Sequence, residues 1–345
     1  MADALISPAV GGGMWAATAV LTVYSAKKVR VDLDERKVPL MGVLGAFIFA
    51  AQMINFTIPG TGSSGHLGGG LILAILLGPY AGLLTMASIL AVQAFFFGDG
   101  GLLAMGCNIF NLGFFPCFIA YPVIFKPITG KRPTPGRIMI GACLAAIIGL
   151  QLGSFSVVLE TLMSGISELP FQTFLWLMQP IHLGIGIVEG LVTAAVVTFV
   201  WKARPEILEK TNAGVAYGNI AIKRVLIGLL VVAALTGGVL SWFASTNPDG
   251  LEWAIFHTSD KEELQAPRGI HGTLAEIQKN TAILPDYSFK TTEEDVVPSD
   301  VKAEPKGAWP EVSGGTTVSG LVGGLFTLLL AGLIGYGLRL IKKQV

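Results

Sequence analysis

The chain has 345 residues and carries 23 basic and 23 acidic side chains, so its formal net charge is zero. Hydrophobic residues make up 52% of it and charged residues 13%, whereas a soluble domain carries about 25% charged residues. The composition excludes an ordinary soluble protein, and the charge balance gives no indication of nucleic-acid binding.

Apolar runs close to the ~20 residues that cross a bilayer recur along the whole chain. Each is predicted to be a helix, because a span in lipid must satisfy its own backbone hydrogen bonds. The third run is short, and Gly78-Pro79 breaks the chain directly after it, which is typical of a half-helix entering from a loop. The predicted spans are 9–27, 39–58, 66–79, 80–98, 101–125, 137–158, 171–201, 223–244 and 316–340.

Basic residues between these spans predict the orientation, because cytoplasmic loops are rich in Lys and Arg. Placing every basic cluster inside requires an outside N-terminus, nine crossings and a cytoplasmic C-terminus. The clusters are Lys27, Lys28, Arg30, Lys37, Lys126, Lys131, Arg132, Arg137, Lys202, Arg204, Lys223, Arg224, Lys342 and Lys343.

A long polar segment, about 245–315, lies between the last two spans and contains about twice as many acids as bases. It is predicted to be a solvated, acidic loop on the outer face. With a boundary in the polar linker near residue 215, the chain divides into two modules. We expect a seven-helix bundle over 1–214 and, over 215–345, a two-helix hairpin that carries the extracytoplasmic loop.

Several polar side chains interrupt the apolar spans, where hydrocarbon penalises them and function is the default explanation. In the predicted topology they lie near the outer ends of their spans, as do His66 and Asp99, and could converge on one outward-facing pocket. The alternative is that the amides join neighbouring helices by hydrogen bonds. The amides are Gln52, Asn55, Gln93, Asn108 and Asn111.

The most unusual stretch is "IPGTGSSGHLGGG" (Ile58–Gly70), a flexible Gly/Ser-rich segment around His66. Histidine is the commonest metal ligand, but a metal site needs three or four donors. Any further ligands must come from the backbone, amides or a chain terminus, since no HxH or HExxH pattern is present. The alternative is a structural histidine that donates to a backbone carbonyl.

His182 and Glu189 lie two helical turns apart in "QPIHLGIGIVEG" and therefore share one helix face. They could form a proton relay, or they could serve helix packing or coupling to a partner, beside glycines that permit close helix approach. Packing or coupling is the preferred interpretation. Glu160, near the outer end of its span, is expected to be solvated.

No catalytic machinery is evident in the sequence. There is no phosphate-binding GxxxxGK[ST] motif and no nucleophile triad, and the three cysteines show no CxxC spacing. A membrane metalloenzyme would need a base beside His66, and none stands out. The chain is predicted not to be an enzyme, so ATP, if it drives transport, must be hydrolysed by another chain.

Long motifs resemble one known family. They are "ADALISP" at residues 2–8, the run from "FIFAAQMINF" to "GCNIFNLGFFPC", and "PIHLGIGIVEG". Together they resemble the CbiM/NikM family, the substrate-binding membrane subunits of prokaryotic energy-coupling-factor (ECF) transporters for cobalt and nickel. The resemblance covers roughly residues 1–210. "NPDGLEWA" (Asn247–Ala254) resembles the PDGLE motif of the small accessory subunit, here fused to the C-terminus.

The resemblance implies a metal site at the outer end of the bundle. In the family, the N-terminal amine, the amide nitrogen and imidazole of a histidine at position two, and a loop histidine hold the metal. The loop histidine corresponds to His66 and the amine to Met1, and four nitrogens in a plane suit Ni(II) or Cu(II). Position 2 is Ala2 here, which predicts a native chain that begins Met-His upstream of Met1. With Met1 as the first residue, metal binding is expected to be weak, or another donor such as Asp3 must substitute.

Two functions remain open at this point. The resemblance implies a cell-membrane component that imports Co²⁺ or Ni²⁺ with an ECF transmembrane coupling subunit and ATPase subunits. The alternative is a stand-alone ion-coupled transporter that uses His182 and Glu189.

Overall fold

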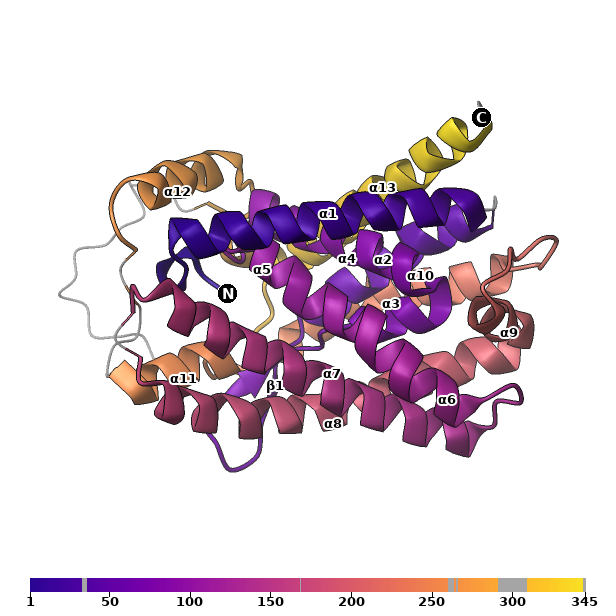
Figure 1. Cartoon of the computed structure of the whole chain (residues 1–345), viewed down its shortest axis with the longest axis horizontal. Helices are drawn as coiled ribbons and strands as arrows, with labels where there is room; N and C mark the ends of the chain where they lie inside the picture. Colours follow the sequence, from indigo (N-terminus) through magenta and orange to yellow (C-terminus); the bar gives the residue numbers. More distant parts are fainter. Residues whose placement is uncertain (33–35, 168, 260–263, 265, 291–308, 344–345) are drawn as a thin grey trace.

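A computed structural model describes residues 1–32, 36–167, 169–259, 264, 266–290 and 309–343. It is a bundle of helices with one short antiparallel hairpin, β1 (Phe56–Thr57) and β2 (Ser64–Gly65) (Figure 1). The helices of the first two-thirds of the chain are η1 (Asp3–Leu5), α1 (Pro8–Asp32), α2 (Lys37–Gln52), α3 (Gly70–Leu77), α4 (Pro79–Val92), η2 (Gln93–Phe97), α5 (Met105–Ile109), η3 (Phe110–Phe125), α6 (Lys126–Thr129), α7 (Pro135–Ser164), α8 (Phe171–Ala203) and α9 (Pro205–Ala213). Those of the remainder are α10 (Lys223–Gly238), η4 (Leu240–Phe243), α11 (Gly250–Ser259), α12 (Ile270–Thr281), η5 (Pro285–Tyr287) and α13 (Gly314–Lys343).

Six helical stretches of the described chain are long and apolar enough to cross a membrane. This confirms the prediction of a helical, multi-pass membrane protein. Three further predicted spans correspond to α2, α3 and α10, which have 16, 8 and 16 residues. Because these are shorter than the ~20 residues of a full crossing, the division into seven crossings and a two-helix hairpin stays a prediction. The six stretches are Pro8–Arg30, Pro79–Phe97, Met105–Thr129, Pro135–Ser164, Phe171–Ala203 and Gly314–Ile341.

The third predicted span forms a short helix at the centre of the bundle. All eight residues of α3 are buried. Glycines in the left-handed or an adjacent positive-φ region precede and follow it, Gly69 at φ +77° and Gly78 at φ +85°. Such angles favour glycine, and Pro79 then begins α4. The structure therefore has the half-helix and the break that the sequence indicated.

The other helices pack around this centre. α7 lies along α8, η3 contacts both α7 and α3, and α13 lies beside α2. Close approach of α7 and α8 depends on glycine, since a Cβ on Gly190 would lie 2.5 Å from the Cα of Cys143. η3 is a wide-turned π-helix that contains Pro116 and Pro122. Proline disturbs the ordinary helical hydrogen-bond ladder, which accounts for irregular backbone here.

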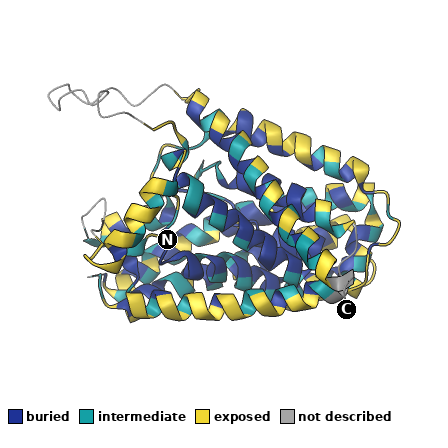
Figure 2. Ribbon diagram, turned by 90° about the horizontal axis from the view of Figure 1, so that it is seen from above, coloured by how far each residue is buried: buried dark blue, intermediate teal, exposed yellow. Residues whose placement is uncertain are grey.

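Burial divides the bundle into an inner and an outer layer. Figure 2 shows exposed residues along the outward faces of the peripheral helices and buried residues inside. Large apolar side chains lie exposed on that outer layer, among them Trp176 on α8 and Leu162 on α7. This is the surface expected of helices that face lipid rather than water.

The described helices after residue 245 dock on the bundle, so this part of the predicted loop is not fully solvated. α11 packs against α8, and α12 contacts η2. His271 of α12 is buried and its Nε2 donates to the Ile6 carbonyl at 2.8 Å. The polar composition of the segment indicated solvation, but His271 instead binds the backbone of the first module. Residues 291–308 of the predicted loop lie outside the described residues.

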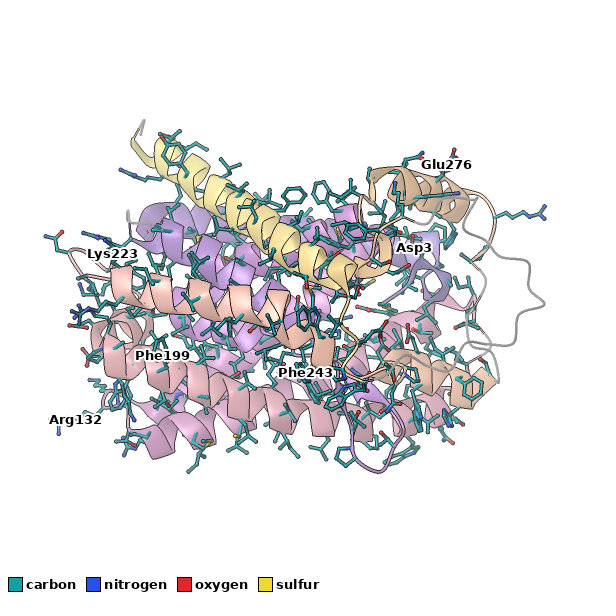
Figure 3. The ribbon with its side chains drawn as sticks, turned by 180° about the vertical axis from the view of Figure 1, so that it is seen from behind. Asp3, Arg132, Phe199, Lys223, Phe243 and Glu276 are labelled. Carbon is teal, nitrogen blue, oxygen red and sulfur yellow. The ribbon has the colours of Figure 1, made fainter. Side chains whose placement is uncertain are left out.

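Basic and acidic residues lie at opposite ends of the bundle. Figure 3 places Arg132 and Lys223 at one end, and Asp3 with Glu276 of α12 at the other. The chain termini also lie toward opposite ends of the bundle (Figure 1).

Candidate metal centre

A cavity of ≈ 130 Å³ lies at the end of the bundle that holds the N-terminus. Four parts of the chain line it: the N-terminus, the Gly/Ser-rich loop, helices of the bundle and the start of α11. Of the predicted site residues, the structure brings together Met1, His66, Asn108, Asn111 and His182. The lining residues are Met1, Gly65, His66, Gly68, Asn108, Asn111, Leu112, Leu150, Gly153, Ser154, Val157, Met178, His182, Ile185, Asp249, Gly250 and Leu251.

The Gly/Ser-rich loop reaches the cavity through the β-hairpin. Phe56 pairs with Gly65, and the hairpin is closed by the Ile58 amide, which donates to the Ser63 carbonyl at 2.9 Å. Gly65 lies directly against the Ile185 side chain of α8, where a Cβ would overlap it. The backbone can therefore pass close to α8 and carry His66 into the cavity wall.

A buried carboxylate holds the loop directly after His66. The Gly68 amide donates to Glu189 Oε2 at 2.7 Å and the Gly69 amide to Oε1 at 3.1 Å. On the other side, Gln52 Nε2 donates to the Gly68 carbonyl at 2.9 Å, and Gln93 Nε2 donates to Gln52 Oε1 at 3.0 Å. Two of the predicted pocket amides thus lie behind the loop and position it, rather than lining the cavity.

The N-terminus is folded into the opposite wall. The Met1 carbonyl accepts from the Gly101 amide at 3.1 Å and from Asn108 Nδ2 at 3.2 Å. Asp3 Oδ1 accepts from the Ala104 amide at 2.9 Å. These contacts fix the first residues against α5 and the segment before it, and Met1 lines the cavity.

Two predictions about polar residues need correction or refinement. Glu160 is buried rather than solvated, because Asn111 Nδ2 donates to its Oε2 at 2.8 Å and Ser156 Oγ to its Oε1 at 3.2 Å. The backbone carbonyl of Asn55 accepts from the Ser245 amide at 2.7 Å and so joins the segment after α2 to the C-terminal part of the chain. It does not line the cavity.

Both cavity histidines are held in the same way. Nδ1 of His66 donates to the Leu67 carbonyl at 3.0 Å, and Nδ1 of His182 donates to the Met178 carbonyl at 2.8 Å. A carbonyl can only accept, so each neutral ring keeps its proton on Nδ1 and its lone pair on Nε2. This is the tautomer that a metal-ligating histidine adopts when a second partner fixes the ring.

His182 and Glu189 have separate partners, although they share a helix face. His182 lines the cavity, whereas Glu189 binds the loop amides and adjoins a smaller space behind it. The hydrogen bonds described for the two side chains do not join them to each other.

The remaining wall comes from the C-terminal part of the chain. The Ser64 amide donates to the Pro248 carbonyl at 2.7 Å, and Ser64 Oγ donates to the Asn247 carbonyl at 2.8 Å. These bonds bring Asp249, Gly250 and Leu251 to the cavity. Sequence reasoning missed Asp249, although its place in the PDGLE motif was a usable signal.

The described His, Cys, Asp and Glu side chains contain no group of three arranged to hold a metal ion. A metal held beside His66 would need donors in addition to these side chains, and Met1 lines the same cavity as His66. Metal ligation by Met1 and His66 stays a prediction.

Comparisons with known proteins agree with a transport function. The family model "Cobalt uptake substrate-specific transmembrane region" matches residues 1–207, and the "PDGLE domain" matches 223–340. The fused nickel transport protein NikMN of Rhodobacter capsulatus is 29% identical over 315 residues, which cover 83% of this chain and 87% of that protein.

Two solved structures resemble the fold. A crystal structure of a transition metal transporter has 29% identity and a TM-score of 0.53, and the match covers 61% of this chain and 96% of that one. A truncated transition metal transporter has 28% identity and a TM-score of 0.52, over 59% of this chain and 98% of that one.

Proposed function

This chain belongs to the family of cobalt uptake substrate-specific transmembrane proteins, with a PDGLE module on the same chain, and we propose that it is the metal-binding component of an ATP-driven ECF importer. Its cargo is Ni²⁺ or Co²⁺. A transmembrane coupling subunit and ATPase subunits complete the transporter. The chain lies in a prokaryotic cell membrane, and its own role is to bind the ion and release it, without catalysing a reaction.

The observation that carries the proposal is the shared cavity of Met1 and His66. Met1 and the imidazole of His66 line one cavity at the end of the bundle that holds the N-terminus, and the imidazole keeps its Nε2 lone pair available. Nitrogen donors of this kind suit Ni(II) and the neighbouring first-row ions. In this proposal Met1 and His66 bind the metal, while Gln52, Gln93 and Glu189 position the loop.

The proposed orientation has the N-terminus outside and the C-terminus in the cytoplasm. Supporting it, the cavity lies with Asp3 and Glu276 at one end, and the basic residues Arg132 and Lys223 lie at the other. Excess Lys and Arg is typical of cytoplasmic ends. The cavity then opens toward the side from which the ion is captured.

The proposed domain arrangement is a metal-binding module over 1–214 and an accessory module over 215–345. Supporting it, the first family model ends at residue 207, within α9, and the second begins at residue 223, after the linker. The accessory module contributes by closing one wall of the cavity, through Ser64 and the start of α11.

Uptake of radioactive Ni²⁺ and Co²⁺ by reconstituted vesicles tests the proposal. We expect uptake with the coupling subunit, ATPase and ATP, and none when the ATPase carries an inactivated nucleotide site. Robust uptake driven by a pH gradient in vesicles without any ATPase would instead establish the ion-coupled transporter. The separate partners of His182 and Glu189 give no direct support to a relay between them.

A further inference from the structure

The PDGLE motif caps the N-terminus of α11 and uses only one oxygen of the Asp249 carboxylate for this. Asp249 Oδ1 accepts from the Leu251 and Glu252 amides, both at 2.8 Å, and Glu252 Oε2 accepts from the Asp249 amide at 3.1 Å. This is a capping box at the N-terminus of α11. An asparagine caps about as well as an aspartate, so the cap does not explain a negative charge at position 249.

The motif is pressed against α8 beside His182. A Cβ on Gly250 would lie 2.6 Å from Ile181 Cγ2 and 3.7 Å from His182 Cε1. Asp249 and His182 line the same cavity. The hydrogen bonds described above use Asp249 Oδ1 and His182 Nδ1. The second carboxylate oxygen of Asp249 and Nε2 of His182 are not used in them, and both atoms can bind a metal ion.

We propose that His182 and Asp249 form a second position for a divalent transition-metal cation, in the same cavity as the site of His66 and Met1. The inference deepens the proposed function and rests on it. One imidazole and one carboxylate, completed by water, suit Ni²⁺, Co²⁺ or Zn²⁺. Because a carboxylate suits these ions less well than nitrogen does, this position binds more weakly than the site of His66 and Met1 and holds an ion on its way to it.

The position joins the two modules, because Asp249 belongs to the accessory hairpin and His182 to α8. It gives the fused module a chemical role in addition to closing the cavity. Among the described residues that line the cavity, the titratable ones are Met1, His66 and His182 of the first module and Asp249 of the motif.

Titration of the full-length protein with Co²⁺ tests the inference, with calorimetry for stoichiometry and visible absorption for the ligand field. The wild-type protein is expected to bind in a tight and a weak step. Asp249→Asn keeps the cap and removes the charge. It should weaken the second step by about tenfold or more, since losing even an indirect partner of a metal ligand costs 10–100-fold.

Matched variants separate the two steps. Glu252→Gln keeps the capping box and removes a nearby exposed charge, so both steps should persist. His182→Gln should lose the weak step, and His66→Ala the tight one. Equal thermal midpoints of Asp249→Asn and the wild type show that the fold is intact.

Three results would overturn the inference: a single step in the wild type, an unchanged weak step in Asp249→Asn, or an unchanged weak step in His182→Gln. If one tight step remains and disappears in His66→Ala, the proposed function stands and the second position does not exist. If the wild-type protein binds neither Co²⁺ nor Ni²⁺, the proposed function itself fails.

Discussion

The amide of Gly68 donates to the carboxylate of Glu189 at 2.7 Å, across 121 positions of the chain. This bond connects the segment that follows His66 with the middle of α8. The carboxylate is buried and takes the Gly69 amide with its other oxygen. Glu189 therefore holds the loop in place, and its predicted role in packing or coupling stays a prediction.

Glu189→Gln should lower Ni²⁺ affinity by about tenfold or more. The substituted amide can accept from one glycine amide but presents an N–H₂ group to the other, and a charge-assisted hydrogen bond contributes about 1.5–3 kcal/mol. Equilibrium dialysis measures the change. Glu209→Gln, an exposed residue of α9, is the matched control. Equal affinity of Glu189→Gln and wild type would exclude the positioning role.

His66→Ala should abolish high-affinity binding of Ni²⁺ and Co²⁺ while leaving the bundle folded. The side chain lines the cavity and makes one described hydrogen bond, to the carbonyl of the next residue. Little stability depends on it, so the thermal midpoint should remain close to that of the wild type. His257→Ala removes an exposed histidine of α11 and should bind metal normally. Unchanged dialysis with His66→Ala would refute the ligand assignment.

Gly250→Ala should loosen the contact between α11 and α8. The added Cβ would lie 2.6 Å from Ile181 Cγ2, and overpacking of this kind costs about 1–3 kcal/mol. Faster proteolysis of the 245–290 segment and weaker metal binding are the expected readouts. At Gly272 of α12 a Cβ meets nothing within 4 Å, so Gly272→Ala should be neutral or stabilise the helix by about 0.5–1 kcal/mol. Similar proteolysis of both variants would count against close packing at Gly250.

Docking of the accessory segment should weaken in alkaline solution. Burial, and next the Asp99 carboxylate that accepts from its hydroxyl, raise the pKa of Tyr287 well above the ordinary value. The folded protein therefore holds this proton more tightly than the unfolded chain. The stabilisation is complete below about pH 10, the pKa of an unperturbed tyrosine, and is lost as the pH rises above it.

Thermal midpoints between about pH 8 and 11 measure this effect. Tyr287→Phe should be less stable than wild type at the lower end and should lack the tyrosine-dependent decline above about pH 10. Tyr336→Phe removes an exposed tyrosine of α13 and should retain the wild-type profile. An identical pH profile for Tyr287→Phe and wild type would show that the Asp99 contact contributes nothing.

Some of this architecture could be predicted because its causes are local. Apolar run length indicates membrane helices, and Gly78-Pro79 interrupts them wherever they lie. The Gly/Ser-rich loop around His66 stood out because such a composition is unusual beside apolar spans. The cavity includes that histidine, as expected, and Met1 with it.

Other features depend on pairs of residues far apart in the chain. From the sequence alone, Glu160 is expected to be a solvated acid near a helix end, whereas in the structure Asn111 donates to it. Likewise, the sequence places Pro248 in a polar loop, whereas in the structure its carbonyl accepts from the Ser64 amide. In both cases the hydrogen-bond partner is distant in the chain, and composition within a window of sequence contains no information about that partner.

The bond between Ser64 and Pro248 also has a consequence for assembly. When two docking surfaces belong to one chain, each experiences the other at an effective concentration that can reach the millimolar range. The fused module therefore cannot be lost by dilution or by unequal synthesis of two polypeptides, and every metal-binding bundle is made with its own closing segment. Cutting the linker after α9 would convert this fixed pairing into an ordinary association, sensitive to expression level and detergent dilution.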